Sequence, residues 1–514
     1  MKNRKTLVGQ FRDLLKNEFR DYNGKTLLSD IIAGITVGAV ALPLALAFGA
    51  ASVGNADPTI GIVAGMITAI IAGLVCGLLG GGSFQISGPT GAMTVILGSV
   101  VAGEHGLTGM FAASLIAGVI LLLAGILHFG KIVKFIPKPV VTGFTSGIAI
   151  VIALGQLGNF FGVKLEGETT VDKLVYFFTD TLGSISLTAV ICSLAVVLIM
   201  VVYPKKAAKF VPGSLAAIII ITVITAVFKV DVATIGEIPR TLINSERLAI
   251  GEINLDLIGD VAGSAVTVAL LGMVESLLCG ACAANMKKEK FDSNIELVAQ
   301  GVGNIIIPFF GGVPATAAIA RTSVAVKSGG KTRLASVFHS VFLVACMFLL
   351  SGAIGLVPYA ALAGVLVVTA VRMNEFEQIK DYFKGKKWGA IAQFVVTMVA
   401  TVLLDLTYAI VIGVVLAFAL YGFDILKLKR ANKPVSKLKI EKELVNGSAS
   451  LKVNGVYYFA NSDAIASEVD SLGEYSVLSI DMSGVIYTDY TAKEAFDELI
   501  NNLKTSGKEV SVNA

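Results

Sequence analysis

A succession of fourteen apolar segments between residues 29 and 426 constrains the fold of this chain more than any other feature. The segments run roughly over 29–50, 58–80, 90–103, 108–129, 136–158, 184–203, 212–229, 260–282, 294–310, 315–326, 333–354, 357–372, 388–404 and 407–426. Hydrophobic residues make up 55% of the 514 residues, whereas charged residues make up only 15%. No soluble core needs this much apolar sequence, so the pattern predicts a polytopic α-helical membrane protein.

Basic side chains concentrate in alternate loops, as the positive-inside rule requires of cytoplasmic loops. The loops that would be cytoplasmic if the N-terminus is inside carry Lys131, Lys134, Lys138, Lys205, Lys206, Lys209, Lys287, Lys288, Lys290, Lys327, Lys331, Arg333, Arg372, Lys380, Lys384, Lys386 and Lys387. The opposite set includes the loop 230–259, where acidic residues outnumber arginines. We therefore expect an even number of segments in an inner or plasma membrane, with both termini cytoplasmic.

Residues 1–28 form a basic, amphipathic stretch that precedes the first apolar segment. Phe11, Leu14, Leu15 and Phe19 follow helical spacing, which predicts a helix lying along the cytoplasmic membrane surface. The stretch has no early apolar core, so it does not have the pattern of a cleaved signal peptide.

The third and tenth apolar segments are too short to cross a bilayer, which takes about 20 residues. Each follows a glycine-rich break, a proline and small residues, over 80–92 and 311–317. Each is the third segment of a run of seven, and seven is odd, so the second run is expected to be inverted. Isolated Gly/Pro pairs commonly do no more than kink a helix. Paired broken helices at matching positions of inverted repeats point instead to a substrate site at the membrane midplane.

The second break predicts a half-length helix from Ala315 to Val326, with Pro314 at its first position. The first backbone N–H groups of a helix have no partner within it, and the positive end of the dipole attracts anions. Arg321, two turns in, adds a full positive charge. We therefore predict half of an anion site here, although Arg321 could instead extend to the cytoplasmic surface. The prediction requires Thr90 and Thr316 to meet, without carboxylates of the protein blocking the helix starts.

Glu275 is the one acid that the sequence places well inside an apolar segment. A carboxylate at that depth costs about 2.5–3.5 kcal/mol on insertion scales, so it normally faces a polar cavity. Its charge would respond to burial and to a nearby cation as the site opens and closes. We expect Glu275 to couple anion movement to a second ion; the alternative is a permanent structural pairing with Arg321 or with backbone donors.

Beyond Lys427 the composition becomes that of a soluble protein. Residues 449–460 read as paired strands and 476–481 as a buried strand, with helices over 463–472 and 492–505. A further strand begins at Lys508. This alternation predicts a small cytoplasmic α/β domain over 437–514.

Several motifs, in this order, resemble the sulfate permease (SulP) family of anion transporters with a C-terminal STAS domain. They are Ala41-Leu-Pro43-Leu-Ala-Leu-Ala-Phe48, Ser87-Gly88-Pro89-Thr90, Leu271-Gly-Met-Val-Glu275-Ser276, Asn294-Ile-Glu296-Leu-Val-Ala-Gln300-Gly, Gly311-Gly-Val-Pro-Ala-Thr-Ala-Ala-Ile-Ala-Arg321-Thr and, in the tail, Ile480-Asp481-Met-Ser-Gly-Val485. The resemblance covers nearly the whole chain.

The resemblance implies a transporter domain over 29–428 in which a core (segments 1–4 and 8–11) moves against a gate (segments 5–7 and 12–14) as an elevator, within a homodimer. It places the anion between the starts of segments three and ten. The implied contacts are Phe48, Thr90, Gly91, Ala92, Thr316, Ala317, Ala320 and Arg321. Some members of the family use a carboxylate on the helix of Glu275 to help bind sodium.

Two positions depart from the family pattern. Many members have Gln directly after the proline of segment one, where this chain has Leu44, so a side-chain donor is missing and the identity of the anion is left open. The tail has Tyr490-Thr491 where related soluble STAS domains have a phosphorylatable Ser directly after Asp, which weakens the case for regulation by phosphorylation.

The sequence as a whole predicts secondary active transport of a small anion, sulfate or bicarbonate, coupled to H⁺ or Na⁺. A dicarboxylate symporter or an uncoupled anion channel on the same scaffold remains an alternative. A membrane enzyme or signalling receptor lacks support, because no catalytic set or phosphate-binding loop is present. A nucleobase transporter would need carboxylates where this chain has Arg321. Cys279-x-x-Cys282 has no second ligand pair, so we expect no metal, cofactor or nucleic-acid partner beside the membrane lipid.

Overall fold

The computed structural model describes residues 6–53, 58–130, 136–166, 170–204, 206–207, 211–287, 289–404, 406–432, 435–445, 448–472 and 475–513. The chain forms two compact units, one of Met1–Lys131 with Ile148–Met373 and one of Ile132–Gly147 with Asn374–Ala514. Helix α6 (Lys138–Gly155) contributes residues to both units. Several expected loop lysines, among them Lys131, Lys134, Lys205, Lys209 and Lys288, lie outside the described residues.

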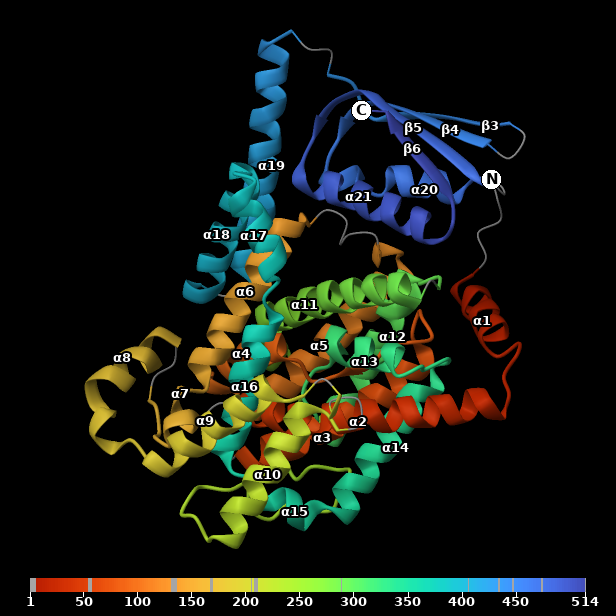
Figure 1. Cartoon of the computed structure of the whole chain (residues 1–514). Helices are drawn as coiled ribbons and strands as arrows, with labels where there is room; N and C mark the ends of the chain where they lie inside the picture. Colours follow the sequence, from red (N-terminus) through yellow and green to blue (C-terminus); the bar gives the residue numbers. More distant parts are fainter. Residues whose placement is uncertain are drawn as a thin grey trace. The chain divides into compact units, whose positions relative to one another are not determined.

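The first unit is helical (Figure 1). It also contains two short strands. Its first half contains α1 (Leu7–Glu18), α2 (Gly24–Ser52), α3 (Pro58–Leu79), β1 (Ser87–Gly88), α4 (Gly91–Ala102), α5 (Gly106–Ile126), α7 (Leu157–Phe161), α8 (Thr170–Asp180), α9 (Leu187–Val202) and α10 (Gly213–Val227). Its second half contains α11 (Leu255–Lys287), α12 (Ser293–Ile306), the 3₁₀ turn η5 (Ile307–Phe310), β2 (Thr316–Ala317), α13 (Ile319–Lys327), α14 (Leu334–Leu349), α15 (Ser351–Gly355) and α16 (Tyr359–Met373).

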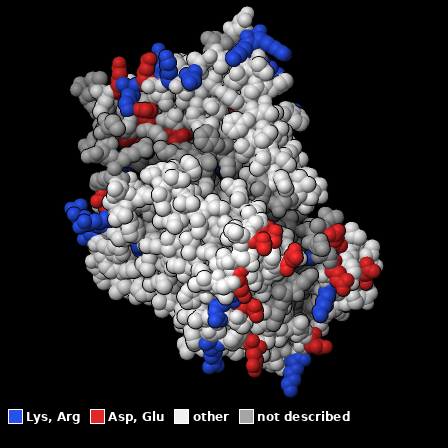
Figure 2. All heavy atoms as spheres, turned by 180° about the vertical axis from the view of Figure 1, so that it is seen from behind, with Lys and Arg blue, Asp and Glu red and all other residues white. Residues whose placement is uncertain are grey.

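Among the described residues, seven helices are long and apolar enough to cross a membrane, and five further apolar helices are shorter. One face of the molecule carries a wide area without charged side chains (Figure 2), as contact with lipid tails requires. The chain therefore folds as a polytopic helical membrane protein, as its composition predicts. The amphipathic helices α8 and α17 (Phe376–Lys384) connect apolar segments and were not expected from the sequence.

The second unit combines α17, α18 (Trp388–Leu403) and α19 (Leu406–Arg430) with the start of α6 and a four-stranded sheet. The sheet has the order β3-β4-β5-β6, over Lys439–Val445, Ser448–Tyr457, Val477–Thr488 and Glu509–Asn513. The β3–β4 pair is antiparallel and the other two pairs are parallel. The predicted pair of strands over 449–460 is wrong, because that stretch is the single strand β4 and its hairpin partner lies earlier.

Helices α20 (Ala464–Asp470) and α21 (Tyr490–Thr505) cover one face of this sheet (Figure 1). Side chains of β4 alternate between exposed and buried, because successive residues of a strand point to opposite faces. The buried side of the sheet packs on the two helices through Leu451, Val453, Ile465, Leu478, Ile480, Leu503 and others. The tail is thus a small α/β domain, as predicted.

The stretch before the second half-length helix is extended, and the predicted helix from Ala315 to Val326 is wrong in its first turn. Helix α13 begins at Ile319, and Pro314 lies five residues upstream rather than at its first position. Residues Thr316 and Ala317 instead pair antiparallel with Gly88 and Ser87. Gly311 ends η5 with a left-handed φ of 77°, a backbone conformation that glycine adopts at little cost.

Side chains from three other helices replace the helical hydrogen bonds of this extended stretch. The Asn304 amide donates to the carbonyl of Ala315 (2.9 Å) and accepts from its N–H (2.8 Å). The Thr68 hydroxyl donates to the carbonyl of Val313 over 2.7 Å. The Ser276 hydroxyl accepts from the N–H of Ala317 over 3.2 Å. Because every one of these donors and acceptors is buried, the extended conformation is fixed by tertiary contacts.

Candidate functional site

The two glycine-proline breaks meet at the β1–β2 pair. Thr90, the residue before α4, and Thr316, in β2, bring their hydroxyl oxygens within 3.3 Å of each other. Gly88 and Thr316 are direct partners in the strand pair. The antiparallel direction of the pair is the one that two inverted copies of a strand–half-helix unit produce. The sequence repeat therefore predicted correctly that these two residues would lie together.

The Glu275 carboxylate of α11 lies at this junction. Its Oε2 accepts hydrogen bonds from the Thr316 hydroxyl (2.5 Å) and the Thr90 hydroxyl (2.9 Å). Thr90 is the N-cap of α4, yet its side chain does not cap that helix, because the hydroxyl is directed to Glu275 instead. Glu275 also keeps partial solvent exposure, unlike its neighbours Val274 and Ser276. A carboxylate of the protein thus lies beside the half-helix starts, so the expectation that none would be there is wrong. It is bonded to the two threonine hydroxyls, and among the described residues no N–H group of α4 or α13 donates to it.

Arg321 lies in the first turn of α13, closer to the break than the two turns predicted from the sequence. Its side chain is only 1% exposed. Nη2 donates to the carbonyl of Pro89, whereas Nη1 is buried without a hydrogen-bond partner. A Cβ at position 88 would collide with Nη1. Glycine at this position therefore leaves room for the guanidinium. Arg321 does not extend to the surface.

Among the described residues, no ion pair within 4.0 Å joins Glu275 to Arg321, although each lies in the electric field of the other. The pairing with Arg321, one of the two alternatives considered for Glu275, is therefore absent from this conformation. The carboxylate is held by hydroxyl groups, and the guanidinium by one carbonyl. Each charged group keeps unused hydrogen-bonding capacity, since a carboxylate has about four acceptor positions and a guanidinium five donors.

The remaining predicted site residues lie at or beside this junction. Phe48 of α2 is buried and lies next to Gly91, where an added Cβ would approach the Phe48 ring to 3.0 Å. Ala92 and Ala317 are buried as well. Ala320 is exposed, one residue before the buried Arg321. The first N–H groups of α4 and α13 have no partner within their own helices, which is general for helix starts.

Two buried acids were missed when Glu275 was taken as the only one within the apolar segments. Asp30 accepts from the N–H groups of Lys331 and Thr332 and from the Thr332 hydroxyl, so it anchors the turn before α14. Glu296 of α12 is 0% exposed. Both lie near the ends of apolar segments, where an acid ordinarily reaches water, and the sequence offers no signal that neighbouring helices cover them.

Potential metal ligands are scattered over the part of the chain that the structure describes. Among the described residues, no cluster of three or more His, Cys, Asp or Glu could hold a metal ion. The Cys279 thiol donates to the Thr322 hydroxyl over 3.3 Å and is buried, whereas Cys282 is exposed. Cys279-x-x-Cys282 is therefore not a pre-formed pair of ligands.

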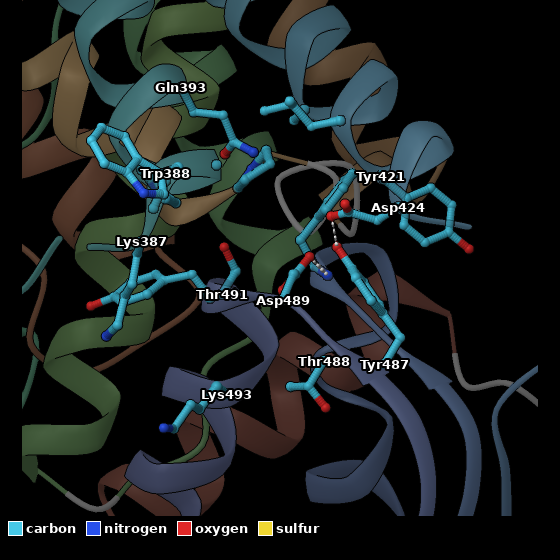
Figure 3. A pocket seen from close by; sticks show the side chains of 18 residues that line it. Lys387, Trp388, Gln393, Tyr421, Asp424, Tyr487, Thr488, Asp489, Thr491 and Lys493 are labelled. Atoms are coloured by element: carbon cyan, nitrogen blue, oxygen red, sulfur yellow. Dashed lines mark hydrogen bonds between the residues drawn. The ribbon is translucent and has the colours of Figure 1, made fainter. Parts of the chain in front are cut away.

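A cavity of about 300 Å³ lies within the second unit, between α18, α19 and the turn before α21. Figure 3 shows Asp424 and Tyr487 joined across it, with the Tyr487 hydroxyl donating to the carboxylate over 3.2 Å. The Lys387 ammonium at its edge is already bound to Asp381 over 2.7 Å. None of the predicted site residues lines this cavity.

Comparisons with known proteins agree with the fold and with the motifs. The model of the sulfate permease family matches residues 27–399. YvdB of Bacillus subtilis (strain 168) is 35% identical over 497 residues, which cover 95% of this chain and 91% of that protein. The structure of the transmembrane domain of a cyanobacterium bicarbonate transporter, BicA, matches with a TM-score of 0.68 and 28% identity, covering 76% of this chain and 98% of that one.

A second structure, murine Slc26a9 in the inward-facing state, matches over 99% of this chain and 89% of that chain, with a TM-score of 0.72 and 18% identity. At that identity the match concerns the fold alone, and it extends through the C-terminal α/β domain. The family model covers more than half of the chain, and the relatives it resembles are transporters rather than enzymes. This chain belongs to the sulfate permease family.

Proposed function

We propose that this protein is a secondary active transporter of a small inorganic anion, sulfate or bicarbonate, coupled to the movement of H⁺ or Na⁺. The observation that carries the proposal is Arg321, a guanidinium buried beside two converging helix starts with Nη1 unpartnered. An unpaired buried cation is costly, and an anion that accepts from it would remove that cost. The free N–H groups of α4 and α13 would supply further donors.

Glu275 is the coupling residue of this proposal. Its ionised carboxylate between Thr90 and Thr316 would repel an anion arriving at the same junction, since like charges a few ångströms apart in a low-dielectric site repel strongly. A proton on Glu275, or a sodium ion bound to it, removes that repulsion. Anion and cation would then bind together more tightly than either alone, which is the thermodynamic requirement of a symporter.

The anion contacts we assign are Phe48, Thr90, Gly91, Ala92, Thr316, Ala317, Ala320 and Arg321. We assign sulfate or bicarbonate as the transported anion on the names of two relatives, "Putative sulfate transporter YvdB" and "Bicarbonate transporter BicA". Backbone amides and a guanidinium recognise the charge and the size of an anion. The site itself therefore does not distinguish sulfate from bicarbonate.

For the transport cycle we propose an elevator movement in a homodimer of the cell membrane, with both termini cytoplasmic. The moving core would comprise α2–α5 and α11–α14 and the gate α6, α9, α10, α16, α18 and α19, within a transporter domain over 29–428. Residues 1–28 would lie on the cytoplasmic surface and 437–514 would form the STAS-like domain. The inverted breaks support this scheme, because such repeats underlie alternating access in many transporters.

Uptake into proteoliposomes tests the proposal. Purified protein is reconstituted, and entry of labelled sulfate, bicarbonate and a small dicarboxylate is followed with and without imposed proton or sodium gradients. We expect one inorganic anion to enter faster when a cation gradient points inward. Entry of every anion at the same rate with or without a gradient would favour an uncoupled channel, and entry of the dicarboxylate alone would contradict the substrate class.

A further inference from the structure

Glu296 is a carboxyl group that the proposed transport mechanism does not use. It lies in the first turns of α12, is 0% exposed, and each of its oxygens has one partner. The backbone N–H of Gly81 donates to Oε2 over 2.9 Å, and the Gln300 amide donates to Oε1 over 2.8 Å. Both donors are neutral.

No cation compensates this carboxyl group directly. Among the described residues, no Lys, Arg or His lies within ion-pair distance of Glu296. The Arg333 guanidinium, before α14, acts on it through space but is bound to Glu18 over 2.8 Å. The thiols of Cys76 on α3 and Cys279 on α11 face the same region, and α5 brings no titratable side chain. Burying a charge without a partner is costly, so this environment favours binding of a proton.

Gln300 connects Glu296 to the strand that leads to the anion site. Its Nε2 also donates to the Ser87 hydroxyl over 2.7 Å, and Ser87 begins β1, the partner strand of β2. Its backbone carbonyl accepts from Asn304, which fixes Ala315. Its side-chain Oε1, however, is buried without a hydrogen-bond partner. The nitrogen of the Gln300 amide therefore makes two hydrogen bonds, whereas its oxygen makes none.

We propose that Glu296 is a second proton-binding site of this transporter, and that Gln300 and Ser87 relay its protonation to β1. The inference rests on the proposed function and deepens it, since it names a titrating group besides Glu275. It follows from the geometry of three side chains, in which the Gln300 Nε2 lies between Glu296 and Ser87, and from the Oε1 of the same amide, which has no partner.

The two protonation states match two orientations of the Gln300 amide. When Glu296 is ionised, Nε2 donates to both Glu296 and Ser87, as in this structure. When Glu296 takes a proton from water, its new O–H group needs an acceptor. Half a turn of the amide exchanges Oε1 and Nε2, so that Glu296 and Ser87 each donate to Oε1 while Nε2 takes the present place of Oε1 and gives up both of its acceptors. The Ser87 hydroxyl then changes from acceptor to donor.

That reversal acts on the strand beside the substrate. Ser87 pairs with Ala317, and Gly88 with Thr316, whose hydroxyl contacts Glu275. A change in the hydrogen bonding of Ser87 therefore acts on β2, the strand that holds Thr316 against the carboxylate of Glu275. Protonation of Glu296 and occupancy of the anion site are thus linked, and by reciprocity the anion changes the proton affinity of Glu296.

Infrared difference spectroscopy of the purified full-length protein, between about pH 5 and about pH 9, tests the proton site without any substrate. The carbonyl stretch of a protonated carboxyl group is distinct from that of a carboxylate. We expect a protonated-carboxyl band that is lost in Glu296→Gln but persists in Glu275→Gln and in the control Glu289→Gln, which changes a more exposed acid. Difference spectra of wild type and Glu296→Gln that coincide over this range would overturn the proton site.

The relay has its own test. In Gln300→Met the band should shift, because the acceptor of the Glu296 O–H is gone, and this variant also serves if Glu296→Gln does not fold. In Ser87→Ala the band should remain, while the pH dependence of sulfate and bicarbonate uptake into proteoliposomes is reduced at least about twofold. An unshifted band in Gln300→Met, or uptake by Ser87→Ala with the wild-type pH profile, would overturn the relay.

Absence of anion uptake by the wild type would instead overturn the proposed function and leave the infrared result standing.

Discussion

The hydroxyl of Thr316 donates to the carboxylate of Glu275 over 2.5 Å, and this bond joins the second helix break to the helix that carries the proposed coupling residue. Thr316→Val keeps the shape of the side chain and removes the donor. Hydrogen bonds to charged groups contribute about 1.5–3 kcal/mol, so we expect gradient-driven anion uptake to fall about tenfold or more. Initial rates in proteoliposomes measure this. Thr316→Ser keeps the hydroxyl and is the control; equal losses in both variants would contradict a role for the bond.

Arg321 should set the affinity for the anion. Arg321→Ala removes the buried guanidinium whose Nη1 has no protein partner, so the KM for the transported anion should rise by about ten- to a hundredfold. Arg12→Ala, which removes an exposed arginine of α1, is the control for loss of charge. An unchanged KM in Arg321→Ala would remove this residue from the binding site.

We predict that position 91, at the start of α4, accepts only glycine. A Cβ there would lie 2.5 Å from Cδ1 of Ile152 and 3.0 Å from Cε1 of Phe48. Gly91→Ala should therefore displace Phe48 and lower anion uptake several-fold, since overpacking of this kind costs about 1–3 kcal/mol. Gly155→Ala is a matched control in another helix, with nothing within 4 Å of the new Cβ. Uptake reduced equally in both would point to a general effect of helix stiffening.

Asp489 in the C-terminal domain gives a pH prediction. It caps α21 by accepting from the N–H of Ala492 over 2.8 Å, and burial raises its pKa above the ordinary 3.8. A carboxyl whose folded pKa is raised stabilises the fold below its unfolded pKa, and that contribution is lost as pH rises through the folded pKa. Relative to Asp489→Asn, the wild-type α21 should lose protection from hydrogen exchange with rising pH, by at most about 1.4 kcal/mol per unit. A pH-independent difference between the two proteins would contradict this.

Much of the candidate site could be predicted from the sequence because it rests on local chemistry. Gly-Pro breaks before two short apolar segments pointed to Thr90 and Thr316, whose hydroxyl oxygens lie 3.3 Å apart. The extended conformation of Thr316 and Ala317 could not be predicted, because Asn304, Thr68 and the β1 strand impose it from elsewhere in the chain. Because α13 begins later than predicted, Arg321 lies in its first turn rather than in the second.

The buried acids show a different limit. Glu275 stands out because apolar residues flank it on both sides, whereas Glu296 follows the charged N-cap Asp292 and looks like the exposed start of a helix. Its burial arises from the Gly80–Gly82 turn, where Gly81 donates to it, and from Gln300 one turn later. Tertiary covering of this kind leaves no periodic signal in the sequence.

Accumulation of the anion against its own gradient tests the central claim most directly. Proteoliposomes with wild-type protein, an inward proton or sodium gradient and equal anion concentration on both sides should concentrate the labelled anion inside. Glu275→Gln should only equilibrate it, while Glu237→Gln, which changes an exposed acid, should behave as the wild type. Accumulation by Glu275→Gln to the wild-type level, or no accumulation by the wild type under either gradient, would contradict the account.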